Sequence, residues 1–387
     1  MGGGTPRGIS SRIRRFLKPF VDGLSKGASR VMGEVFTGML ASRSCLLSEV
    51  GRSIQDETTL PHREKRFSRE LDRRGWWQEP LAQCVLARGV RQVGQEDPIA
   101  VDLSDLSKPY ARKMEYLDTV RDGSKKTITR GYWLYEAWHI DRSGQPLPLQ
   151  LFPYSTKDPQ FISENQEWLN GLWPLMEALA GRGILVLDRG TDRWKLMKEL
   201  LKKPQQWIIR QLGERHLVGP GNVRKRVIQW AREALEQKNE PQAMPVRLPG
   251  SPTPLWLVVA PPLPGDDEGK PFMLLCRVSW KGKIAPRALG VYGRRWRCED
   301  AIRATKQGLG LEKFLVRSMR RIVRIVLIAL LVMRFIAERV AHEAAWTRRL
   351  IDCDERFSKP IKVYLSSTLG AIRRCVSPRR KLVWVPP

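Results

Sequence analysis

The order of apolar segments predicts an α/β fold, with helical regions before and after a central sheet. Three strand-like segments follow one another between residues 99 and 155, and the middle one is the aromatic run RGYWLYEAWHI. From residue 165 onward, segments with helical spacing alternate with short, fully apolar segments. Alternating or continuous apolar runs are typical of strands, whereas apolar residues three and four positions apart are typical of helices. A chain of 387 residues has room for two or three domains around such a sheet.

Residues 1–95 are predicted to form a helical domain, because apolar side chains such as Phe16, Phe20 and Leu24 recur at helix-like intervals. In a second helical stretch, ETTLPHREKRFSRELDRRGWW, cations outnumber acids. These cations are Arg63, Lys65, Arg66, Arg69, Arg73 and Arg74. A basic helix suits a DNA groove or backbone, and the alternative is an ordinary solvated surface helix. His62 is interpreted as a helix-start residue rather than a ligand.

Residues 96–211 are predicted to form the first part of the core. A short strand, Ile99 to Val101, ends at Asp102, and the segments RGYWLYEAWHI and PLPLQLFPYS complete an antiparallel meander. A helix over NQEWLNGLWPLMEAL, the strand ILVL, a helix over DRWKLMKELLKK and the strand QWIIRQL follow. Three antiparallel strands followed by alternating helix and strand are the outline of an RNase H-like sheet. His139, within the aromatic strand, is interpreted as a sheet residue.

Residues 212–272 interrupt the core with a basic helix, VRKRVIQWAREALEQ, and a proline-rich stretch that indicates short strands and loops. Residues 273–345 resume it, and the strand-like FMLLCRVS, residues 272–279, lies at this boundary. Trp256 and Trp280 are the tryptophans best suited to stack on an unpaired base, although core packing is the simpler interpretation of each. Residues 346–387 form a basic tail.

The apolar run from Ile325 to Met333 is predicted to be a core helix, since nine residues are too few to span a membrane. Arginines interrupt the helical tract around this run. We expect the aliphatic side chains to pack on the sheet while the cations of the tract face DNA: Arg317, Arg320, Arg321, Arg324 and Arg334.

Asp102 and Asp188 are candidate catalytic acids because each directly follows an apolar strand. The strand fixes the backbone, and the side chain then faces the open edge of the sheet, where α/β folds keep their sites. Either aspartate alone could instead be a turn or cap residue. Asp105 is an alternative first acid, and Asp102 is preferred because it ends the strand.

A third acid, Glu299, lies in VYGRRWRCEDAIRATKQGLG with the spacing Y-x2-R-x3-E-x6-K. At about 100° per residue, Tyr292, Arg295, Glu299 and Lys306 lie within about 60° of arc on one helix face. Such a face suits a metal-bound phosphate, and the alternative is a solvated, charged helix face. Three acids from two strands and a helix could hold two Mg²⁺ ions about 4 Å apart.

The four spaced residues resemble the Tyr-Arg-Glu-Lys signature of DDE transposases of the insertion-sequence-four group. That family is also similar in the flanking segments YGRRWRCED and KQGLGLE and in the pair Asp188-Arg189. The resemblance as a whole covers residues from about 30 to 345. The resemblance implies an RNase H-like core with a strand-containing insertion, an N-terminal DNA-binding domain and C-terminal helices. It also implies cut-and-paste cleavage of transposon ends and strand transfer, which in this family can pass through a DNA hairpin.

The resemblance assigns roles to individual residues. Asp102, Asp188 and Glu299 would be catalytic and would bind two Mg²⁺ ions, with Mn²⁺ as an alternative. The residues expected to bind DNA near the cut are Tyr292, Arg295 and Lys306, with Arg189 and Arg210 as further candidates. The partners would be transposon ends and target DNA, held by a homodimer.

Composition agrees with a DNA-binding protein. The chain has 68 Lys and Arg against 40 Asp and Glu, a net charge of +28 that attracts polyanions, and nucleic acid is favoured over a membrane. The N-terminus lacks the apolar segment of a signal peptide, and the 6 cysteines lack zinc-like spacing, so we expect a cytoplasmic protein. The resemblance implies that it is bacterial and nucleoid-associated. Two other functions stay open: a decayed or domesticated DNA-binding relative, and a metal-dependent nuclease without strand transfer.

Overall fold

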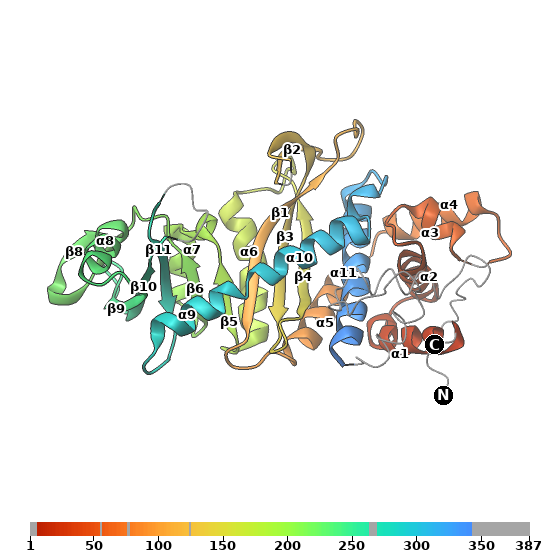
Figure 1. The fold of residues 1–387 in the computed structure, drawn as a ribbon. Helices are drawn as coiled ribbons and strands as arrows, with labels where there is room; N and C mark the ends of the chain where they lie inside the picture. Colours follow the sequence, from red (N-terminus) through yellow and green to blue (C-terminus); the bar gives the residue numbers. More distant parts are fainter. Residues whose placement is uncertain (1–5, 55, 76–77, 124, 263–268, 343–387) are drawn as a thin grey trace, which may run out of the picture.

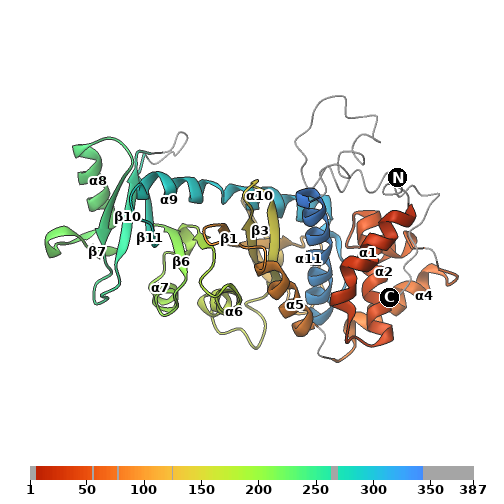
Figure 2. The same cartoon turned by 90° about the horizontal axis from the view of Figure 1, so that it is seen from below.

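The computed structural model describes residues 6–342, except residues 55, 76–77, 124 and 263–268. The predicted basic tail, residues 346–387, lies outside the described residues. A nine-stranded mixed sheet runs through the molecule, with helices on both of its faces and a helical region beyond one edge (Figures 1 and 2). Among the described residues, no helix has both the length and the apolar character needed to cross a membrane.

Five strands form the centre of the sheet in the order β4-β3-β1-β5-β6. They are β1 Pro98–Ser107, β3 Thr127–Ile140, β4 Pro146–Tyr154, β5 Ile184–Leu187 and β6 Gln206–Arg210. The first three pair antiparallel, and β1-β5-β6 pair parallel. These directions confirm the meander and the mixed sheet that the sequence predicted, in the order of an RNase H-like outline.

The sheet extends past both ends of this core. Strand β2, Asp118–Asp122, pairs with the first residues of β3, and the sequence analysis missed it. On the other side, β11 Phe272–Arg277, β10 Leu255–Ala260 and β9 Gln242–Val246 continue the sheet beyond β6. The predicted insertion therefore contributes β9 and β10 to the main sheet, together with a small hairpin of β7, His216–Val218, and β8, Arg224–Arg226.

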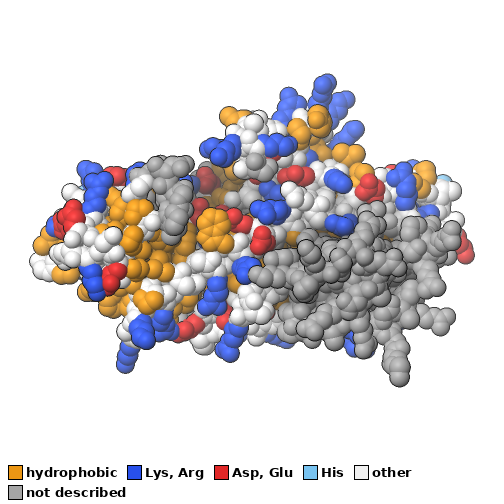
Figure 3. Space-filling view, in the orientation of Figure 1, with side chains coloured by type: hydrophobic (Ala, Val, Ile, Leu, Met, Phe, Trp, Pro, Cys, Tyr) orange, Lys and Arg blue, Asp and Glu red, His pale blue; other side chains and the backbone are white. Residues whose placement is uncertain are grey.

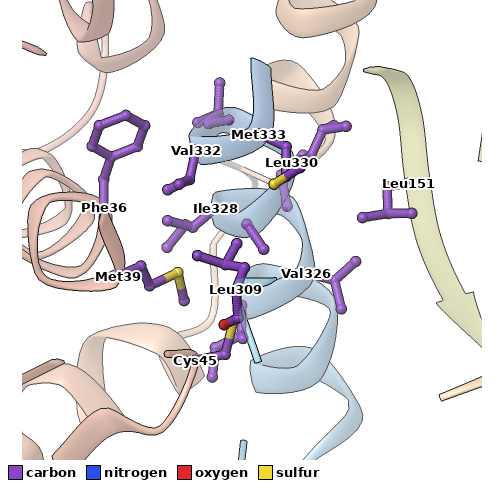
Figure 4. Packing of buried hydrophobic residues seen from close by; sticks show 14 of the residues in the cluster. Phe36, Met39, Cys45, Leu151, Leu309, Val326, Ile328, Leu330, Val332 and Met333 are labelled. Atoms are coloured by element: carbon purple, nitrogen blue, oxygen red, sulfur yellow. The ribbon is translucent and has the colours of Figure 1, made fainter. Parts of the chain in front are cut away.

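The N-terminal region is helical. Its helices are α1 Pro6–Val21, α2 Lys26–Ser42, α3 Leu47–Arg52, α4 Leu60–Asp72 and α5 Gln78–Val90. They pack around α11, Met319–His342, whose other side contacts β4. Figure 4 shows Phe36 and Met39 of α2 on one side of α11 and Leu151 of β4 on the other. The run from Ile325 to Met333 is buried, as predicted for a core helix.

Arg324 and Arg334 do not face DNA, contrary to the expectation from the sequence. Both side chains are buried, and their N–H groups donate hydrogen bonds to atoms inside the protein. Arg324 donates to the carbonyl oxygens of Leu71 at 3.1 Å, Arg73 at 2.9 Å and Gly75 at 3.2 Å, in the last turn of α4 and just after it. Arg334 donates to Pro148 O at 3.3 Å and pairs with Glu338 at 2.8 Å. Buried cations stay in place only when such partners satisfy them.

Two helical layers cover the sheet. On one face lie α6 Glu164–Leu179, α7 Trp194–Leu201 and α8 Val227–Gln237, which share a core with alternate residues of β5 and β6. On the other face lie α9 Ile284–Gly293 and α10 Trp296–Arg303 (Figure 2). His139 is a buried sheet residue, as interpreted from the sequence, and contacts Asp97 Oδ2 through Nε2 at 2.9 Å.

Short helical turns join these elements. They are the 3-10 turns η1 Arg189–Thr191, η2 Pro220–Asn222 and η4 Leu311–Lys313, and the π-helical turn η3 Ala304–Gly308. The Thr59 hydroxyl contacts His62 Nδ1 at 2.7 Å at the start of α4, in agreement with the helix-start interpretation.

Candidate active site

Asp102 and Asp188 lie side by side because β1 and β5 pair in parallel. The register places Val101 beside Leu187, so the next residue on each strand is one of the two aspartates. Neighbouring strands are about 4.8 Å apart, which brings both carboxylates to the same end of the parallel pair. The predicted end of β1 at Asp102 is wrong, because antiparallel pairing with β3 continues to Ser107.

Both aspartates face α9 and α10. Side chains alternate along a strand, and Ile184 and Val186, which precede Asp188 on its face, pack in one cluster with α9. Ala100, two residues before Asp102, belongs to the cluster that contains Cys298 and Ala301 of α10. The acids therefore point toward the helices that carry the spaced residues.

The sequence predicted that the four spaced residues lie on one helix. In the structure they lie instead on a series of consecutive helical turns. Tyr292 lies in α9, Arg295 at the junction of α9 and α10, Glu299 in α10 and Lys306 in the π-helical turn. The backbone at Arg295 keeps helical angles, with φ −53° and ψ −35°, so Arg295 and Glu299 stay close together. The wider turn at residues 304–308 changes the direction of Lys306 relative to an ideal α-helix.

Arg295 joins the helix to the strand. Its Nη1 donates to Asp102 Oδ2 at 2.9 Å, and its Nη2 lies 3.6 Å from Glu299 Oε1. Only 9% of the Arg295 side chain is exposed, compared with 22% for Asp102 and 39% for Glu299. One guanidinium thus positions two of the candidate acids, and the acids keep an open side.

The electrostatics of the site show an excess of negative charge. Burial and the charge of Asp188 raise the pKa of Asp102 to about 6, although Arg295 acts to lower it. Glu299 adds a smaller upward effect on the pKa of Asp102, and burial raises the pKa of Glu299 itself. Burial alone would lower the pKa of Arg295, but Tyr292 and Asp102 help to raise it overall. A cation bound beside these carboxylates would relieve their mutual repulsion.

The acids suit a divalent cation by their chemistry, since carboxylate oxygens are the ligands that Mg²⁺ prefers. In the described part of the chain, however, no three His, Cys, Asp or Glu side chains form a ready-made metal site. The oxygens are partly engaged: Asp102 Oδ1 accepts from Leu103 N at 2.9 Å, and Asp188 Oδ1 accepts from Gly190 N at 2.9 Å.

Asp105, the alternative first acid, is less accessible than Asp102. It is buried, and its Oδ1 accepts hydrogen bonds from Lys306 Nζ at 3.1 Å and Gly123 N at 3.3 Å. Lys306 Nζ also lies 4.0 Å from Glu312 Oε1. In this geometry Asp105 holds Lys306, and Asp102 is the acid beside Asp188.

The remaining predicted DNA-binding residues differ in exposure. Arg189 is exposed and directly follows Asp188. Arg210 is half-buried at the end of β6, with its guanidinium carbon 4.8 Å from the centre of the Phe272 ring. Tyr292 is buried and meets Phe272 edge-on at 5.4 Å. Of these three, Arg189 is the most exposed.

Sequence reasoning missed Glu136, which β3 places opposite Asp102 in the register. Its carboxylate is fully buried, accepts hydrogen bonds from Ser104 Oγ and from Trp138 Nε1, and burial raises its pKa to about 7. Its position within an aromatic run gave no signal of a nearby site. The tryptophan interpretation is supported, because Trp280 is buried against Arg287 and Trp256 is half-buried.

Comparisons with known proteins agree in part with the sequence analysis. A family model described as Transposase DDE domain matches residues 142–335, a segment that contains Asp188 and Glu299 and begins after Asp102. Among solved structures, the chain is similar to a piggyBac transposase synaptic complex with hairpin DNA, at 12% identity and a TM-score of 0.43. That similarity covers 97% of this chain and 79% of the other. No curated protein matches the chain.

Proposed function

The chain belongs to the transposase DDE domain family, and we propose that it cuts DNA at the ends of a mobile element and joins the freed ends to target DNA. It is an enzyme that cleaves and transfers DNA. The observation that carries the assignment of its active site is the in-register pair Asp102 and Asp188, joined by Arg295 to Glu299.

In this proposal Asp102, Asp188 and Glu299 hold the divalent cations. When bound, two Mg²⁺ ions would activate the attacking oxygen and stabilise the leaving 3′ oxygen of an in-line displacement. Arg295 keeps the carboxylates of Asp102 and Glu299 oriented toward each other and offsets part of their repulsion. Side chains do little covalent work, because positioning and charge neutralisation lower the barrier of phosphoryl transfer.

The neighbouring cations would bind the DNA backbone. Arg189 is exposed next to Asp188 and is the best-placed candidate. Lys306 and Arg210 lie at the edges of the site, and Tyr292 supports the α9 side from a buried position. On α4, Arg63 and Arg66 bind internal partners, so the exposed cations available for DNA contact are Lys65 and Arg69 on the helix and Arg73 and Arg74 just after it.

Finer features follow from the resemblance in the signature. The spacing of Tyr292, Arg295, Glu299 and Lys306 supports membership of the insertion-sequence-four group within the wider family. We extend to this chain that group's hairpin intermediate, its strand-containing insertion at residues 212–272, its N-terminal DNA-binding domain and a homodimer on two DNA ends. The bacterial nucleoid would then be its place of action.

Replacing Glu299 with Gln tests the proposal. The substitution removes a metal-binding charge but keeps the size of the side chain, so cleavage of duplexes from the DNA flanking the gene should fall by at least about 10³-fold. DNA binding in a mobility-shift assay should change less than about threefold. The matched control is Asp300→Asn, the neighbouring acid on α10, whose side chain is 51% exposed and pairs with Arg303.

The same assay separates the alternatives. Equal cleavage by wild type and Glu299→Gln would refute the site, and binding without any Mg²⁺-dependent cleavage by wild type would indicate a decayed DNA-binding relative. A pre-cut duplex with a free 3′-OH tests joining. Cleavage without joining of this substrate would indicate a nuclease without strand transfer.

A further inference from the structure

A basic arm projects from the sheet next to the candidate site. The arm comprises residues 108–130, of which 124 lies outside the description: a loop, strand β2, a turn and the first residues of β3. In Figure 3, Lys and Arg side chains gather over β2 at the top of the molecule, with hydrophobic side chains between them. The exposed cations of the arm are Arg112, Lys113, Arg121, Lys125, Lys126 and Arg130.

The acids of the arm offset few of these cations: Asp122 Oδ2 lies 3.7 Å from Lys125 Nζ, and the other acids are used inside the protein. Asp118 and Asp122 are buried, and Asp118 Oδ2 accepts from Thr156 N at 2.7 Å. Glu115 is exposed, but its Oε2 accepts from Met319 N at 2.6 Å. The outer surface of the arm is therefore strongly positive, which favours a polyanion as its partner.

Two apolar side chains stand among the cations. Tyr110 is 94% exposed and Ile128 is 79% exposed, and both line a shallow hollow of about 870 Å³ together with Arg112 and Arg130. Exposing such side chains to water is unfavourable without a partner. Apolar side chains flanked by Lys and Arg are typical of surfaces that contact sugars and base edges in a DNA groove while the cations bind phosphates.

Hydrogen bonds join the base of the arm to the core. Lys108 Nζ donates to the carbonyl oxygens of Glu312 at 2.6 Å and Phe314 at 2.7 Å, and Lys108 N donates to Arg130 O at 2.7 Å. Tyr132 Oη donates to Glu115 O at 2.6 Å. These bonds reduce the entropy that the base would lose on binding, which favours affinity.

The arm is also connected directly to the candidate site. Strand β1 carries Asp102 and leads into the arm after Ser107, a span of five residues or about 17 Å. Asp105 bridges Lys306 and Gly123 of the arm turn. DNA with a phosphate beside Asp102 would reach the arm about five base pairs from the cut, at about 3.4 Å per pair.

We propose that this arm is a clamp for duplex DNA, which grips the element end from about the fifth base pair beyond the cleaved phosphate. The cations bind phosphates on both sides of one groove, and Tyr110 and Ile128 enter that groove. This rests on the proposed function for the identity of the ligand as DNA, while the arm itself is defined by its exposed residues.

Two arm variants and one control test the clamp in the full-length protein. The apolar variant is Tyr110→Ala with Ile128→Ala, and the cation variant is Arg112→Gln, Lys113→Gln and Lys126→Gln. The control removes three exposed lysines at α7, on the opposite face of the sheet: Lys195→Gln, Lys198→Gln and Lys203→Gln. Dissociation constants for a 30-base-pair duplex are measured by fluorescence anisotropy between 50 and 300 mM salt, about the range in which phosphate contacts dominate.

The cation variant should reduce the steepness of the plot of log K against log salt by about 2–3, since each lost phosphate contact contributes about 0.9. The control should change the steepness by less than about 1. The apolar variant should weaken binding about tenfold with the slope unchanged. Hydroxyl-radical footprints should lose protection from about the fifth base pair outward and keep it at the cut.

Equal affinities and slopes for both arm variants and the control would overturn the clamp, even if the wild-type protein cuts DNA. Weaker binding by the arm variants, in a protein whose wild type makes no cut, would support the clamp and refute the proposed function. Circular dichroism melts of the variants check that all of them fold, and the 94% and 79% exposure of the two apolar residues predicts unchanged melting.

Discussion

Arg295 is the residue on which the charge balance of the candidate site depends. Its guanidinium contacts Asp102 and lies near Glu299, while Asp188 faces the same space. One positive charge is thus shared among three carboxylates. Arginine suits this role because its planar group can contact two carboxylates at once and stays charged when it is buried.

Replacing Arg295 with Gln should destabilise the metal-free protein by about 1–3 kcal/mol, because Asp102 loses its charged partner in a partly buried place. Adding Mg²⁺ should then raise the melting temperature of the variant more than that of wild type, since the bound cation replaces the lost charge. Differential scanning fluorimetry with and without MgCl₂, at about 10 mM to fill a Mg²⁺ site, measures both effects.

The control for this experiment is Arg297→Gln, an exposed arginine two residues along the same helical segment. It should leave both the melting temperature and its response to Mg²⁺ near those of wild type. An equal response to Mg²⁺ in all three proteins would show that the cation does not bind beside Arg295.

At the residue scale, the sequence predicted the candidate acids better than their surroundings. Asp188 is a candidate because a fully apolar strand ends directly before it, and Glu299 is a candidate because its neighbours have a distinctive spacing. The sequence favoured Asp102 over Asp105 on a strand end that is wrong, because β1 continues to Ser107, and it is the register with β5 that places Asp102 beside Asp188. Glu136 could not be found, because the contacts that define it come from another strand.

At the scale of the elements, ion pairs between residues far apart in the sequence hold the N-terminal helices together. Arg66 on α4 pairs with Glu34 on α2 at 2.8 Å and with Asp56 at 2.7 Å. Burial alone would raise the pKa of Asp56, but the hydrogen bonds from Arg66 and Thr58 lower it to about 2. The sequence analysis assigned the cations of α4 to DNA, but Arg66, one of them, joins α4 to the neighbouring segments of the domain.

This network predicts a loss of stability in acid. A folded pKa of about 2 against an ordinary 3.8 means that the contribution is complete above about pH 4 and is lost as the pH falls toward 2. We expect about 1–2 kcal/mol, after allowing for solvent screening. The free energy of unfolding is measured with urea at pH values between about 2.5 and 5, the range in which this carboxylate titrates. As the pH falls, this free energy should decrease less in Asp56→Asn than in wild type.

The Asp300→Asn variant is the control for this acid effect, since that carboxylate is exposed on α10 and should leave the pH slope intact. If Asp56→Asn and wild type lose stability equally, then another group causes the acid sensitivity of the domain.

Helix α6 approaches β3 at a glycine. A Cβ atom on Gly171 would lie 2.2 Å from the Tyr135 ring, which is stacked on Phe152 at 4.7 Å and cannot move aside easily. Gly171→Ala should therefore destabilise the protein by about 1–3 kcal/mol, despite the better helix propensity of alanine. Chemical denaturation measures the change.

Gly290 on α9 gives the matched comparison, because no atom lies within 4 Å of the Cβ position there. Gly290→Ala should be neutral or stabilising by up to about 1 kcal/mol. Destabilisation by both variants, or by neither, would contradict a steric cause at Gly171.

The sequence predicted most elements of the core, because short, fully apolar segments such as ILVL and FMLLCR, bounded by turns or polar residues, are typical of buried strands. Strand β2 was missed since DTVRD alternates with charges and is stabilised by its pairing with β3. The length of β1 was underestimated because polar residues follow Asp102, and pairing with β3 overrides their weak strand propensity. The burial of Arg324 depended on carbonyls about 250 positions away, which no local pattern reveals.

At the scale of the whole molecule, charge and chemistry are separate. The cations behind the net charge of +28 are distributed along the whole sequence, including the N-terminal helices and the arm, whereas the candidate acids occupy one small face beside α10. Binding of DNA should therefore draw on many distributed cations, and cleavage on three carboxylates.

This separation predicts that EDTA abolishes cleavage but leaves DNA binding within about twofold of its value with Mg²⁺, because distributed phosphate contacts need no bound metal. The plot of log K against log salt should have a slope of about −4 or steeper under both conditions, as expected for several released counterions. Anisotropy titrations at a series of salt concentrations, with Mg²⁺ or EDTA, give both quantities, and a nicking gel on the same samples reports cleavage. A large loss of affinity in EDTA would mean that the acids and their cations carry much of the binding, because the phosphate at the cut would then be a principal contact rather than one among many.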